Sequence, residues 1–351
     1  MDIPTANIFG VNSDNTGHCG PADLGRCDRR TAQVMTLAPL GLNDIRAAAE
    51  RIRGLVRRTP LLTAAPAREY CELGRGLLLK LELLQVTGSF KARGAISAAL
   101  ALPPERLRRG IVTASAGNHG VGVAYAGWAV GTRATIFLPR CVAADKVAKL
   151  NALGARVVIS GKAWDDSNCL ALQCAKTENL AYIHPFADPD VIAGQGTIAL
   201  EILADAPDID TLIVAVGGGG LISGIAIAAK ALKPDIRVIG VEPTGAPTLH
   251  ESLANGHLVE LTSLNTAAVT LAPRRSEILN LSIIAKVVEQ IVLVKDQEMR
   301  EAARWLWREA AIAAELSGAA AVAALLSSRY RPAAGEKVCA IVCGSGSDGF
   351  G

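Results

Sequence analysis

Short apolar runs alternate with amphipathic runs along residues 110–184, and this alternation restricts the fold more than any other feature of the sequence. The expected strands are residues 110–114, 133–138, 156–160 and 181–184, and the expected helices are 118–130, 143–153 and 163–178. Strands and helices that alternate in this way form parallel sheets, which helices cover on both faces. This part of the chain therefore predicts an open α/β lobe.

A second alternating set flanks the first one in the sequence. Its expected helices are residues 42–56, 191–204, 221–232, 282–287, 296–314 and 318–327, its expected strands are 77–84, 211–216, 237–242, 290–294 and 337–343, and residues 253–275 are expected to be irregular. We therefore predict the α/β class, with two open parallel-sheet lobes. Residues 36–109 and 189–351 are expected to form a large domain, and residues 110–188 a small domain inserted into it.

Composition and charge exclude several classes of protein. Half of the residues are apolar and the formal net charge is +3. There is no long basic run, so nucleic-acid binding has no support. No uncharged apolar stretch reaches membrane-spanning length, and the first residues lack the pattern of a secretory signal. Residues 1–35 are polar and aperiodic, which predicts a mobile N-terminal extension.

The chain has eight cysteines, and none of them form a Cys-x-x-Cys pair. They are Cys19, Cys27, Cys71, Cys141, Cys169, Cys174, Cys339 and Cys343. Scattered cysteines without zinc spacing are typical of reduced residues in a cytosolic protein. We therefore expect a cytoplasmic protein.

Residues 87–94 read Thr-Gly-Ser-Phe-Lys-Ala-Arg-Gly and lead into an alanine-rich helix that ends before Pro103 and Pro104. Ser89 is expected to cap this helix, so that Lys91 lies in its first turn. The positive end of the helix dipole disfavours an ammonium group there, and the pKa of Lys91 should fall. A free amine is the form that a Schiff-base nucleophile needs. The alternative is an ordinary surface lysine.

Four consecutive glycines follow the apolar run 211–216 and open a helix. They are Gly217, Gly218, Gly219 and Gly220. Glycines let several backbone N–H groups converge on one anion at a helix N-terminus, and a phosphate is the natural ligand. A dinucleotide is the alternative, because Glu242 ends the next strand where an acid that binds ribose would lie. Lys91 favours a single phosphate, because a Schiff-base cofactor that carries one phosphate explains both features.

Residues 115–120 read Ser-Ala-Gly-Asn-His-Gly and join a strand end to a helix N-terminus. Ligands bind at such positions in open α/β sheets. Backbone N–H groups there, with the side chains of Ser115, Asn118 and His119, could hold a carboxylate or a ring hydroxyl. The alternative is an ordinary turn that Asn118 caps. A further glycine-rich turn begins at Cys343, although a lone cysteine is most often a small buried residue.

Together these motifs resemble the serine/threonine dehydratase family of fold type II pyridoxal-phosphate enzymes, from Leu40 to the C-terminus. The resemblance implies pyridoxal 5'-phosphate as cofactor, bound in the cleft between the two lobes, with Lys91 as its Schiff-base lysine and as the catalytic residue. It also implies cofactor contacts from Phe90, Lys91, Asn118, Gly217, Gly218, Gly219, Gly220, Leu221 and Cys343. It further implies that Ser115, Asn118 and His119 bind the substrate carboxylate, and that the protein is a homodimer.

Two positions distinguish activities within that family. Relatives that racemise serine have a second serine in the loop, which serves the opposite face of Cα. Ala116 stands there, so we expect a lyase rather than a racemase. In metal-activated relatives a third carboxylate joins Glu242 and the carbonyl of Ala246. Thr248 stands at that position, so a cation would lose one charged ligand, and we predict no metal site.

Two segments depart from the family pattern. The relatives have an asparagine in the last glycine-rich turn, where this chain has Ser345-Gly346-Ser347. Within residues 265–275, Val269 stands where many relatives have a carboxylate. A less polar pocket could favour a bulky β-substituent, such as the phenyl group of 3-phenylserine.

The sequence therefore predicts a pyridoxal-phosphate-dependent dehydratase, an ammonia-lyase of the carbon–oxygen lyase class. Its substrate would be a 3-hydroxy amino acid of the threonine, serine or 3-phenylserine type, converted to a 2-oxo acid and ammonia by α,β-elimination. One alternative is β-replacement, as in cysteine synthases, although their Ser-x-Lys-Asp-Arg and Ser-Gly-Asn-Thr-Gly motifs are absent. The others are a nucleotide-dependent dehydrogenase and a non-catalytic protein that binds the cofactor. We expect no appended effector domain.

Overall fold

The computed structural model describes residues 40–64, 76–140, 142, 144–161 and 164–350, and these belong to one compact unit. The extension predicted at residues 1–35 lies outside the described residues. So do the cysteines at positions 19, 27, 71 and 141.

Six strands form the larger of two sheets, in the order β1-β2-β10-β7-β8-β9. Their bounds are β1 (Leu61–Thr63), β2 (Leu77–Lys80), β7 (Thr211–Ala215), β8 (Arg237–Pro243), β9 (Gln290–Val294) and β10 (Val338–Ile341). All neighbouring pairs run parallel except β1 and β2, which are antiparallel. The predicted parallel sheet is thus confirmed, with one antiparallel edge strand that the sequence pattern does not predict.

Four parallel strands form the second sheet, in the order β5-β4-β3-β6. Their bounds are β3 (Ile111–Ala114), β4 (Ala134–Leu138), β5 (Arg156–Ile159) and β6 (Ala181–Tyr182). Both central strands, β3 and β4, are buried along their whole length. Burial on both faces explains why their sequences do not alternate and are apolar except for Thr113 and Thr135.

The helices cover both sheets. The α-helices are α1 (Leu42–Ile52), α2 (Lys91–Ala101), α3 (Pro104–Arg109), α4 (Asn118–Ala129), α5 (Ala144–Ala152), α6 (Trp164–Thr177), α7 (Pro189–Asp205), α8 (Gly220–Leu232), α9 (Thr248–Asn255), α10 (Ile278–Val287), α11 (Asp296–Ala310) and α12 (Leu316–Leu326), and the 3-10 helices are η1 (Glu82–Leu84), η2 (Val269–Leu271) and η3 (Asp348–Phe350). None of these described helices is long and apolar enough to cross a membrane.

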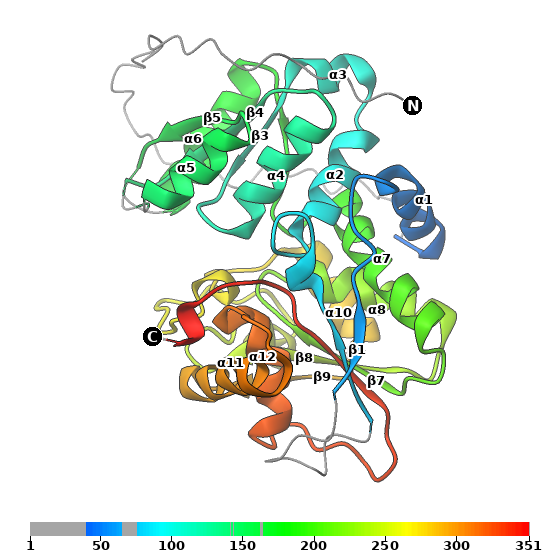
Figure 1. Ribbon diagram of the computed structural model, residues 1–351. Coiled ribbons are helices and arrows are strands. Elements are labelled where there is room, and N and C mark those ends of the chain that lie inside the picture. Colours follow the sequence, from blue (N-terminus) through cyan, green and yellow to red (C-terminus); the bar gives the residue numbers. More distant parts are fainter. Residues whose placement is uncertain (1–39, 65–75, 141, 143, 162–163, 351) are drawn as a thin grey trace. The chain divides into compact units, whose positions relative to one another are not determined.

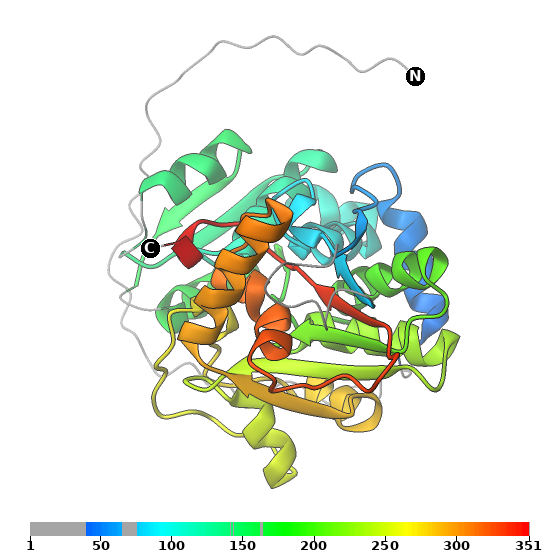
Figure 2. The same ribbon diagram turned by 60° about the horizontal axis from the view of Figure 1, so that its bottom comes forward.

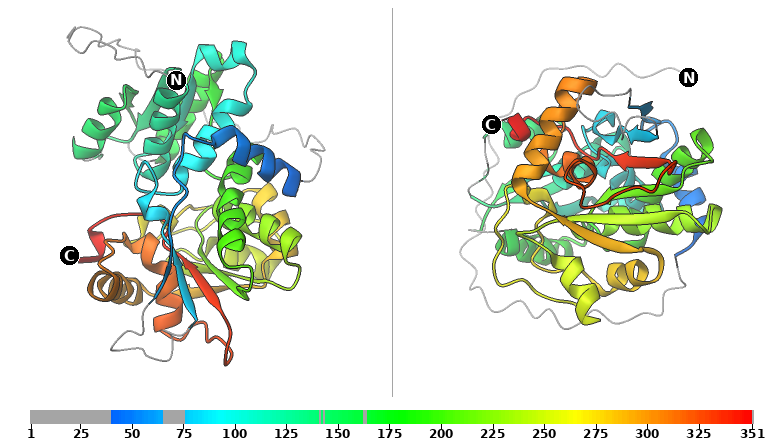
Figure 3. Two further views of the ribbon diagram at one scale, coloured as in Figure 1. Left: turned by 45° about the vertical axis from the view of Figure 1, so that its right-hand side comes forward. Right: turned by 90° about the horizontal axis from the view of Figure 1, so that it is seen from below.

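Helices on both faces of the six-stranded sheet make it the middle of three layers. Figure 1 shows α11 and α12 in front of this sheet and α8 and α10 behind it. Figure 2 brings the orange helices α11 and α12 forward, and the right-hand view of Figure 3 shows the same layers from below. On the other lobe, α4 packs on β3 and β4, and α2 packs against both α4 and α7. The helix that carries Lys91 therefore lies between elements of the two sheets.

Some element boundaries differ from the sequence-based expectation. α9 extends into residues 253–275, which we expected to be irregular. Glu242 stabilises the start of this helix, because it accepts hydrogen bonds from two backbone N–H groups in its first turn. The helix ends only at Gly256, whose φ of +68° is left-handed and favours glycine. The strand expected at residues 77–84 ends at Lys80 and gives way to η1. α10 begins at Ile278, earlier than the pattern indicates.

Two large apolar clusters form the core. One joins the six-stranded sheet to α7, α8, α11 and α12, and the other joins β3 and β4 to α2 and α4. Apolar side chains of α2 belong to the second cluster, although we assigned residues 36–109 to the large domain. The proposed domain boundaries stay a prediction.

Leu212 in β7 tests the first cluster. We expect Leu212→Ala to lower the free energy of unfolding by about 2–5 kcal/mol, because the lost side chain leaves a cavity. Leu212 is 0% exposed, whereas Leu232 at the end of α8 is 40% exposed. The matched control Leu232→Ala should therefore stay within about 0.5 kcal/mol of the parent. Urea unfolding followed by circular dichroism measures both, and equal losses would contradict the placement of β7 in the core.

Candidate active site

All four sequence motifs lie after the carboxyl ends of parallel strands. Lys91 comes after β2, Gly217 after β7 and Cys343 after β10, and these strands are neighbours in one sheet. Ser115 directly follows β3 of the other sheet. Loops at the carboxyl ends of parallel strands form ligand sites in open α/β sheets. Both sheets therefore contribute candidate residues.

Lys91 is the first residue of α2, and its amine is held inside the protein. The Nζ atom donates a hydrogen bond to the carbonyl oxygen of Pro185 at 2.7 Å and lies 5.2 Å from the centre of the Phe90 ring. Burial lowers the pKa of Lys91 to about 8, although Cys343 and Glu315 oppose this shift. The pKa shift has the predicted direction, and its largest cause is burial.

The start of α2 differs from the prediction. Phe90 occupies the N-cap position, and no side chain caps the helix. Ser89 instead forms a β-bridge with Gly344, and its buried hydroxyl has no hydrogen-bond partner among the described residues. The prediction that Ser89 caps the helix is therefore wrong, because pairing with the turn after β10 holds its backbone elsewhere. A buried hydroxyl without a partner beside Lys91 is a group that a bound ligand can satisfy.

The glycine loop leads from β7 into α8, which begins at Gly220. Gly219 has a φ of +92°, a left-handed conformation that favours glycine. A Cβ atom at Gly218 would lie 2.2 Å from the ring of Phe186, and one at Gly220 would lie 2.7 Å from the Phe186 carbonyl oxygen. Side chains are therefore excluded from the loop, and Leu221 is buried in the first turn behind it. The N–H groups at the start of α8 remain available to an anion.

The segment that packs against the glycine loop, residues 184–187, carries functional candidates that no motif indicated. His184 accepts hydrogen bonds at Nδ1 from the backbone N–H groups of Phe186 and Ala187, at 3.2 and 2.8 Å. Burial, and then the charge of Lys91, lowers the pKa of His184 to about 3, so the ring is neutral with its proton on Nε2. The sequence signal for His184 was its position two residues after β6, at the carboxyl end of a strand.

The loop after β3 places its three candidate side chains in different environments. The Ser115 hydroxyl accepts a hydrogen bond from the Gly117 N–H at 3.2 Å. Gly117 is the N-cap of α4, so Asn118 is its first residue and not the cap. His119 donates Nε2–H to the carbonyl of Ile183 at 3.1 Å, and its buried Nδ1 has no partner in the described part of the chain. Burial, followed by the charge of a nearby lysine, keeps the pKa of His119 well below its usual value.

Glu315 belongs to the site, although no sequence motif pointed to it. The Asn118 side chain donates from Nδ2 to Glu315 Oε1 at 2.8 Å. Burial, and then the charge of Asp348, raises the pKa of Glu315 to about 7. The sequence feature that could have indicated Glu315 is its position directly before the apolar helix α12, which places its side chain near a helix N-terminus. That pattern is too common to identify a site by itself.

Cys343 provides an uncharged thiol. Its Sγ donates to the carbonyl oxygen of Ser317 at 3.5 Å, and its own carbonyl oxygen accepts a hydrogen bond from the Phe90 N–H at 3.2 Å. Burial, and then the charge of Glu315, raises the pKa of Cys343, so the thiol stays protonated. The backbone bond to Phe90 ties the turn after β10 to the start of the Lys91 helix.

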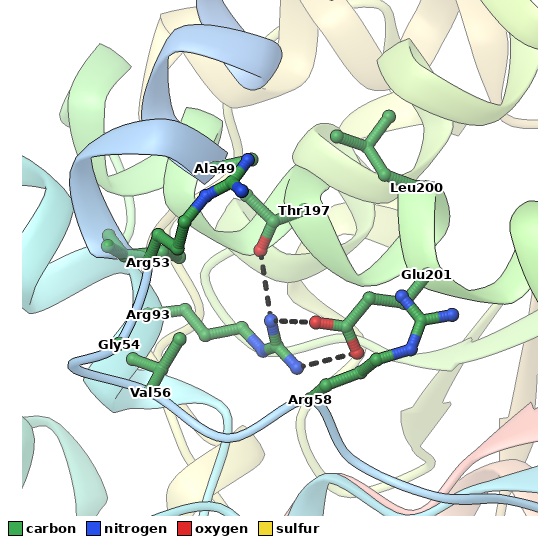
Figure 4. A pocket seen from close by; sticks show the side chains of 10 residues that line it. Ala49, Arg53, Gly54, Val56, Arg58, Arg93, Thr197, Leu200 and Glu201 are labelled. Carbon is green, nitrogen blue, oxygen red and sulfur yellow. Dashed lines mark hydrogen bonds and ion pairs between the residues drawn. The ribbon is translucent and has the colours of Figure 1, made fainter.

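Arg93 anchors the same helix through a buried ion-pair network. It donates to both oxygens of Glu82 at 2.8 Å and to the two oxygens of Glu201 at 2.7 and 3.0 Å. Lys80 donates to Glu201 at 2.6 Å. Figure 4 shows Arg93 and Glu201 together on the wall of a cavity of about 310 Å³. Two cations and two anions balance there, so the network holds α2 against β2 and α7.

The metal-ligand candidates have structural roles. The Glu242 carboxylate accepts hydrogen bonds from the N–H groups of Leu249 and His250 at 2.9 and 2.8 Å. Burial raises the pKa of Glu242 to about 8, although these bonds oppose the shift. Ala246 is buried just before α9. Over the described ranges, no three His, Cys, Asp or Glu side chains gather so that they could hold a metal ion.

These residues fit pyridoxal phosphate. A buried amine with a pKa of about 8 suits condensation with an aldehyde near neutral pH. The glycine-lined N-terminus of α8 suits a phosphate ester. Buried polar atoms of Ser89 and His119 lack partners among the residues that the structure describes. Lys91 would hold the aldehyde carbon, and residues 217–220 would hold the phosphate.

The pKa of Lys91 predicts how the apoprotein reacts with the cofactor. The rate at which pyridoxal phosphate condenses with Lys91 should rise with pH and level off above a midpoint of about 8, because only the free amine reacts. Borohydride trapping followed by peptide mapping measures this rate at Lys91 and at other lysines. A midpoint at Lys91 near the usual lysine pKa of about 10.4 would contradict the effect of burial.

Comparisons with known proteins agree with this chemistry. The model of the family described as "Pyridoxal-phosphate dependent enzyme" matches residues 52–344. The L-threonine ammonia-lyase of Thermotoga maritima is 39% identical over 307 residues, which cover 88% of this chain and 76% of that protein. Maize serine racemase superposes with a TM-score of 0.83 at 34% identity, over 88% of this chain and 94% of that one. The processed form of threonine deaminase isoform 2 from Solanum lycopersicum has a TM-score of 0.81 at 35% identity, over 87% and 83%.

Proposed function

The chain belongs to the pyridoxal-phosphate-dependent enzyme family, and from this premise we propose that it is an ammonia-lyase acting on a 3-hydroxy amino acid. The products are a 2-oxo acid and ammonia. The observation that carries the proposal is the buried amine of Lys91, whose pKa is lowered to about 8 beside the protonated thiol of Cys343. The predicted fold type, cofactor and lyase class are confirmed by the threonine ammonia-lyase and threonine deaminase relatives.

The reaction removes the Cα proton and the β-hydroxyl of the substrate. When bound, the cofactor supplies an electron sink that stabilises negative charge at Cα. Lys91 takes the Cα proton as free amine. We propose that Ser115, Asn118 and His119 orient the substrate carboxylate and that Asn118 also contacts the cofactor. The N–H groups of residues 217–220 would hold the phosphate ester. Water leaves from Cβ, and hydrolysis of the released enamine yields the 2-oxo acid and ammonia.

The Cys343 thiol favours elimination. A carboxylate opposite the pyridine nitrogen would keep that nitrogen protonated and make the ring a strong electron acceptor. Burial raises the pKa of Cys343, so its thiol carries no charge. A weaker acceptor suits a reaction in which the β-hydroxyl departs as the Cα proton is lost. A nucleotide-dependent reaction is less favoured, because it would need the Glu242 carboxylate to bind a ribose. That carboxylate already accepts hydrogen bonds from two backbone N–H groups at the start of α9.

Racemisation is the rival activity, because serine racemases are among the relatives. A racemase needs groups that exchange protons on both faces of Cα. Lys91 serves one face, whereas Ala116 carries only a methyl group in the loop that would serve the other. We therefore favour the lyase. Incubation of the protein with L-serine, followed by chiral chromatography, separates the two activities.

Within the proposed substrate class we favour a bulky, apolar β-substituent. Val269 lies at the start of η2 and is 71% exposed. The neighbouring Thr270 reaches the substrate loop, since its methyl group lies 3.4 Å from where a Cβ of Gly117 would be. An apolar side chain at this lip disfavours a charged substituent and accommodates a phenyl group, as in 3-phenylserine.

We also propose a cellular compartment, an oligomeric state and a domain organisation for the enzyme. We place it in the cytoplasm, as the reduced cysteines Cys169, Cys174, Cys339 and Cys343 suggest. We propose a homodimer, a small inserted domain at residues 110–188, and activity without a bound metal ion.

Release of a 2-oxo acid tests the lyase. The protein should release it from at least one of serine, threonine, 3-hydroxyaspartate and 3-phenylserine, and Lys91→Ala should lower kcat by about 10²–10⁴-fold or more. Lys230→Ala, near the end of α8, is the matched control and should keep full activity. Bound cofactor without 2-oxo acid from any of these amino acids would instead favour β-replacement or a binding role.

Substrate preference tests the role of Val269. The parent should have a higher kcat/KM for 3-phenylserine than for threonine, and Val269→Asp should lower the ratio of these two values by about tenfold, because it restores a charge beside the substituent. Steady-state assays of both amino acids measure the ratio. A parent that clearly prefers threonine or serine would remove this part of the proposal.

A further inference from the structure

Glu315 lies where three parts of the proposed active site meet. Its backbone N–H donates to the Gly344 carbonyl oxygen at 3.2 Å, in the turn that follows Cys343. Its side chain accepts the hydrogen bond from Asn118, in the loop after β3. It is also the N-cap residue of α12. Glu315 thus connects α12 of the six-stranded sheet's lobe with the loop that follows a strand of the other sheet.

The Glu315 side chain does not stabilise its own helix. Within the described residues, the Glu315 side chain makes no capping hydrogen bond to α12. The backbone N–H of Leu316, in the first turn of α12, instead donates to Asp348 Oδ1 at 3.0 Å. Because another carboxylate performs the capping role, the ordinary explanation for a glutamate at a helix start does not apply to Glu315.

The surrounding backbone leaves room for this carboxylate only because of glycines. A Cβ atom at Gly344 would lie 2.3 Å from Glu315 Oε1, and one at Gly346 would lie 2.8 Å from Glu315 Cβ. A Cβ at Gly318 would lie 2.3 Å from the Gly344 carbonyl oxygen. The turn is therefore packed closely around Glu315, and its carboxylate is held in one position against Asn118.

Burial raises the pKa of Glu315 to about 7, so its carboxylate is ionised above that pH, and an ionised carboxylate can orient an amide in one way only. It accepts hydrogen bonds and cannot donate them, so Asn118 must present Nδ2 and not Oδ1 to Glu315. One N–H of the Asn118 amide is thereby used, and its second N–H and its oxygen are left in a fixed orientation. A neutral partner such as glutamine could both donate and accept, and the Asn118 amide could then turn over.

We propose that Glu315 is a positioning residue for the cofactor: it fixes the Asn118 amide so that the remaining N–H is presented to bound pyridoxal phosphate in a single orientation. This inference rests on the proposed function, in which Asn118 contacts the cofactor. Glu315 acts through Asn118 and does not itself touch the reacting atoms. Hydrogen bonds to charged groups are stronger than neutral ones, which makes a carboxylate the effective partner for this task.

A double-mutant cycle on the full-length protein tests the proposal. The readouts are the dissociation constant of pyridoxal phosphate, measured above pH 7 where Glu315 is ionised, and the pH titration of the bound cofactor's absorbance, and neither requires turnover. Glu315→Gln, Glu315→Ala and Asn118→Ala should each raise the dissociation constant by about tenfold, the factor expected for one hydrogen bond to a charged group. Adding either Glu315 substitution to Asn118→Ala should cause little further change in either readout.

The control is Asp348→Asn, which removes a neighbouring carboxylate charge without touching the Asn118 contact. It should keep the parent's cofactor affinity. An equal loss in Asp348→Asn and Glu315→Gln would overturn the proposal, because general loss of negative charge would explain both. Additive effects of the Glu315 and Asn118 substitutions would also overturn it. If Glu315→Ala fails to fold, Glu315→Gln, which keeps the shape of the side chain, carries the test.

The same variants separate this inference from the proposed function. A parent protein that binds the cofactor but releases no 2-oxo acid contradicts the lyase, while the binding cycle still decides the role of Glu315. A parent protein that releases 2-oxo acid, with Glu315→Gln indistinguishable from it in both cofactor readouts, contradicts the positioning role and leaves the lyase intact.

Discussion

Burial of a lysine amine is the constraint on which the rest of this structure depends. Desolvation lowers the pKa of Lys91 to about 8, but it also makes the ammonium form costly to fold around. The protein holds Lys91 in place through its neighbours. Arg93, on the same helix, is clamped by Glu82 and Glu201, and the Phe90 backbone bonds to the turn after β10. The backbone of Lys91 is therefore fixed by contacts that do not involve its amine, and the amine itself donates to the carbonyl oxygen of Pro185.

Close backbone packing is the second shared property of the site. The glycine loop, the turn at Gly344 and the α4 helix all approach functional residues more closely than a side chain would permit. A Cβ at Gly120 of α4, for example, would lie 2.1 Å from the carbonyl oxygen of Ser115. Such approaches bring loops from both sheets to one place and gather N–H groups, a thiol, an amide and an amine in the candidate site.

Local patterns predicted the parts of this site that are contiguous in the sequence. Lys91, the four glycines and the loop beginning at Ser115 each lie between an apolar strand and a helix, so their places at strand ends followed from the alternation. Glu315 and Phe186 could not be found in this way. Each is an ordinary residue in its own segment and acquires a role only from a partner distant in the sequence, as Asn118 is for Glu315.

The sequence by itself determined the α/β class and the order of the strands along the chain, and it indicated Lys91 as the candidate nucleophile, because these depend on periodicity and on motifs within a few residues. Only the tertiary structure decided the cause of the low Lys91 pKa, the loss of the Ser89 cap and the orientation of Asn118. Those features depend on burial and on long-range hydrogen bonds, since desolvation and geometry are properties of packed neighbours and not of adjacent residues.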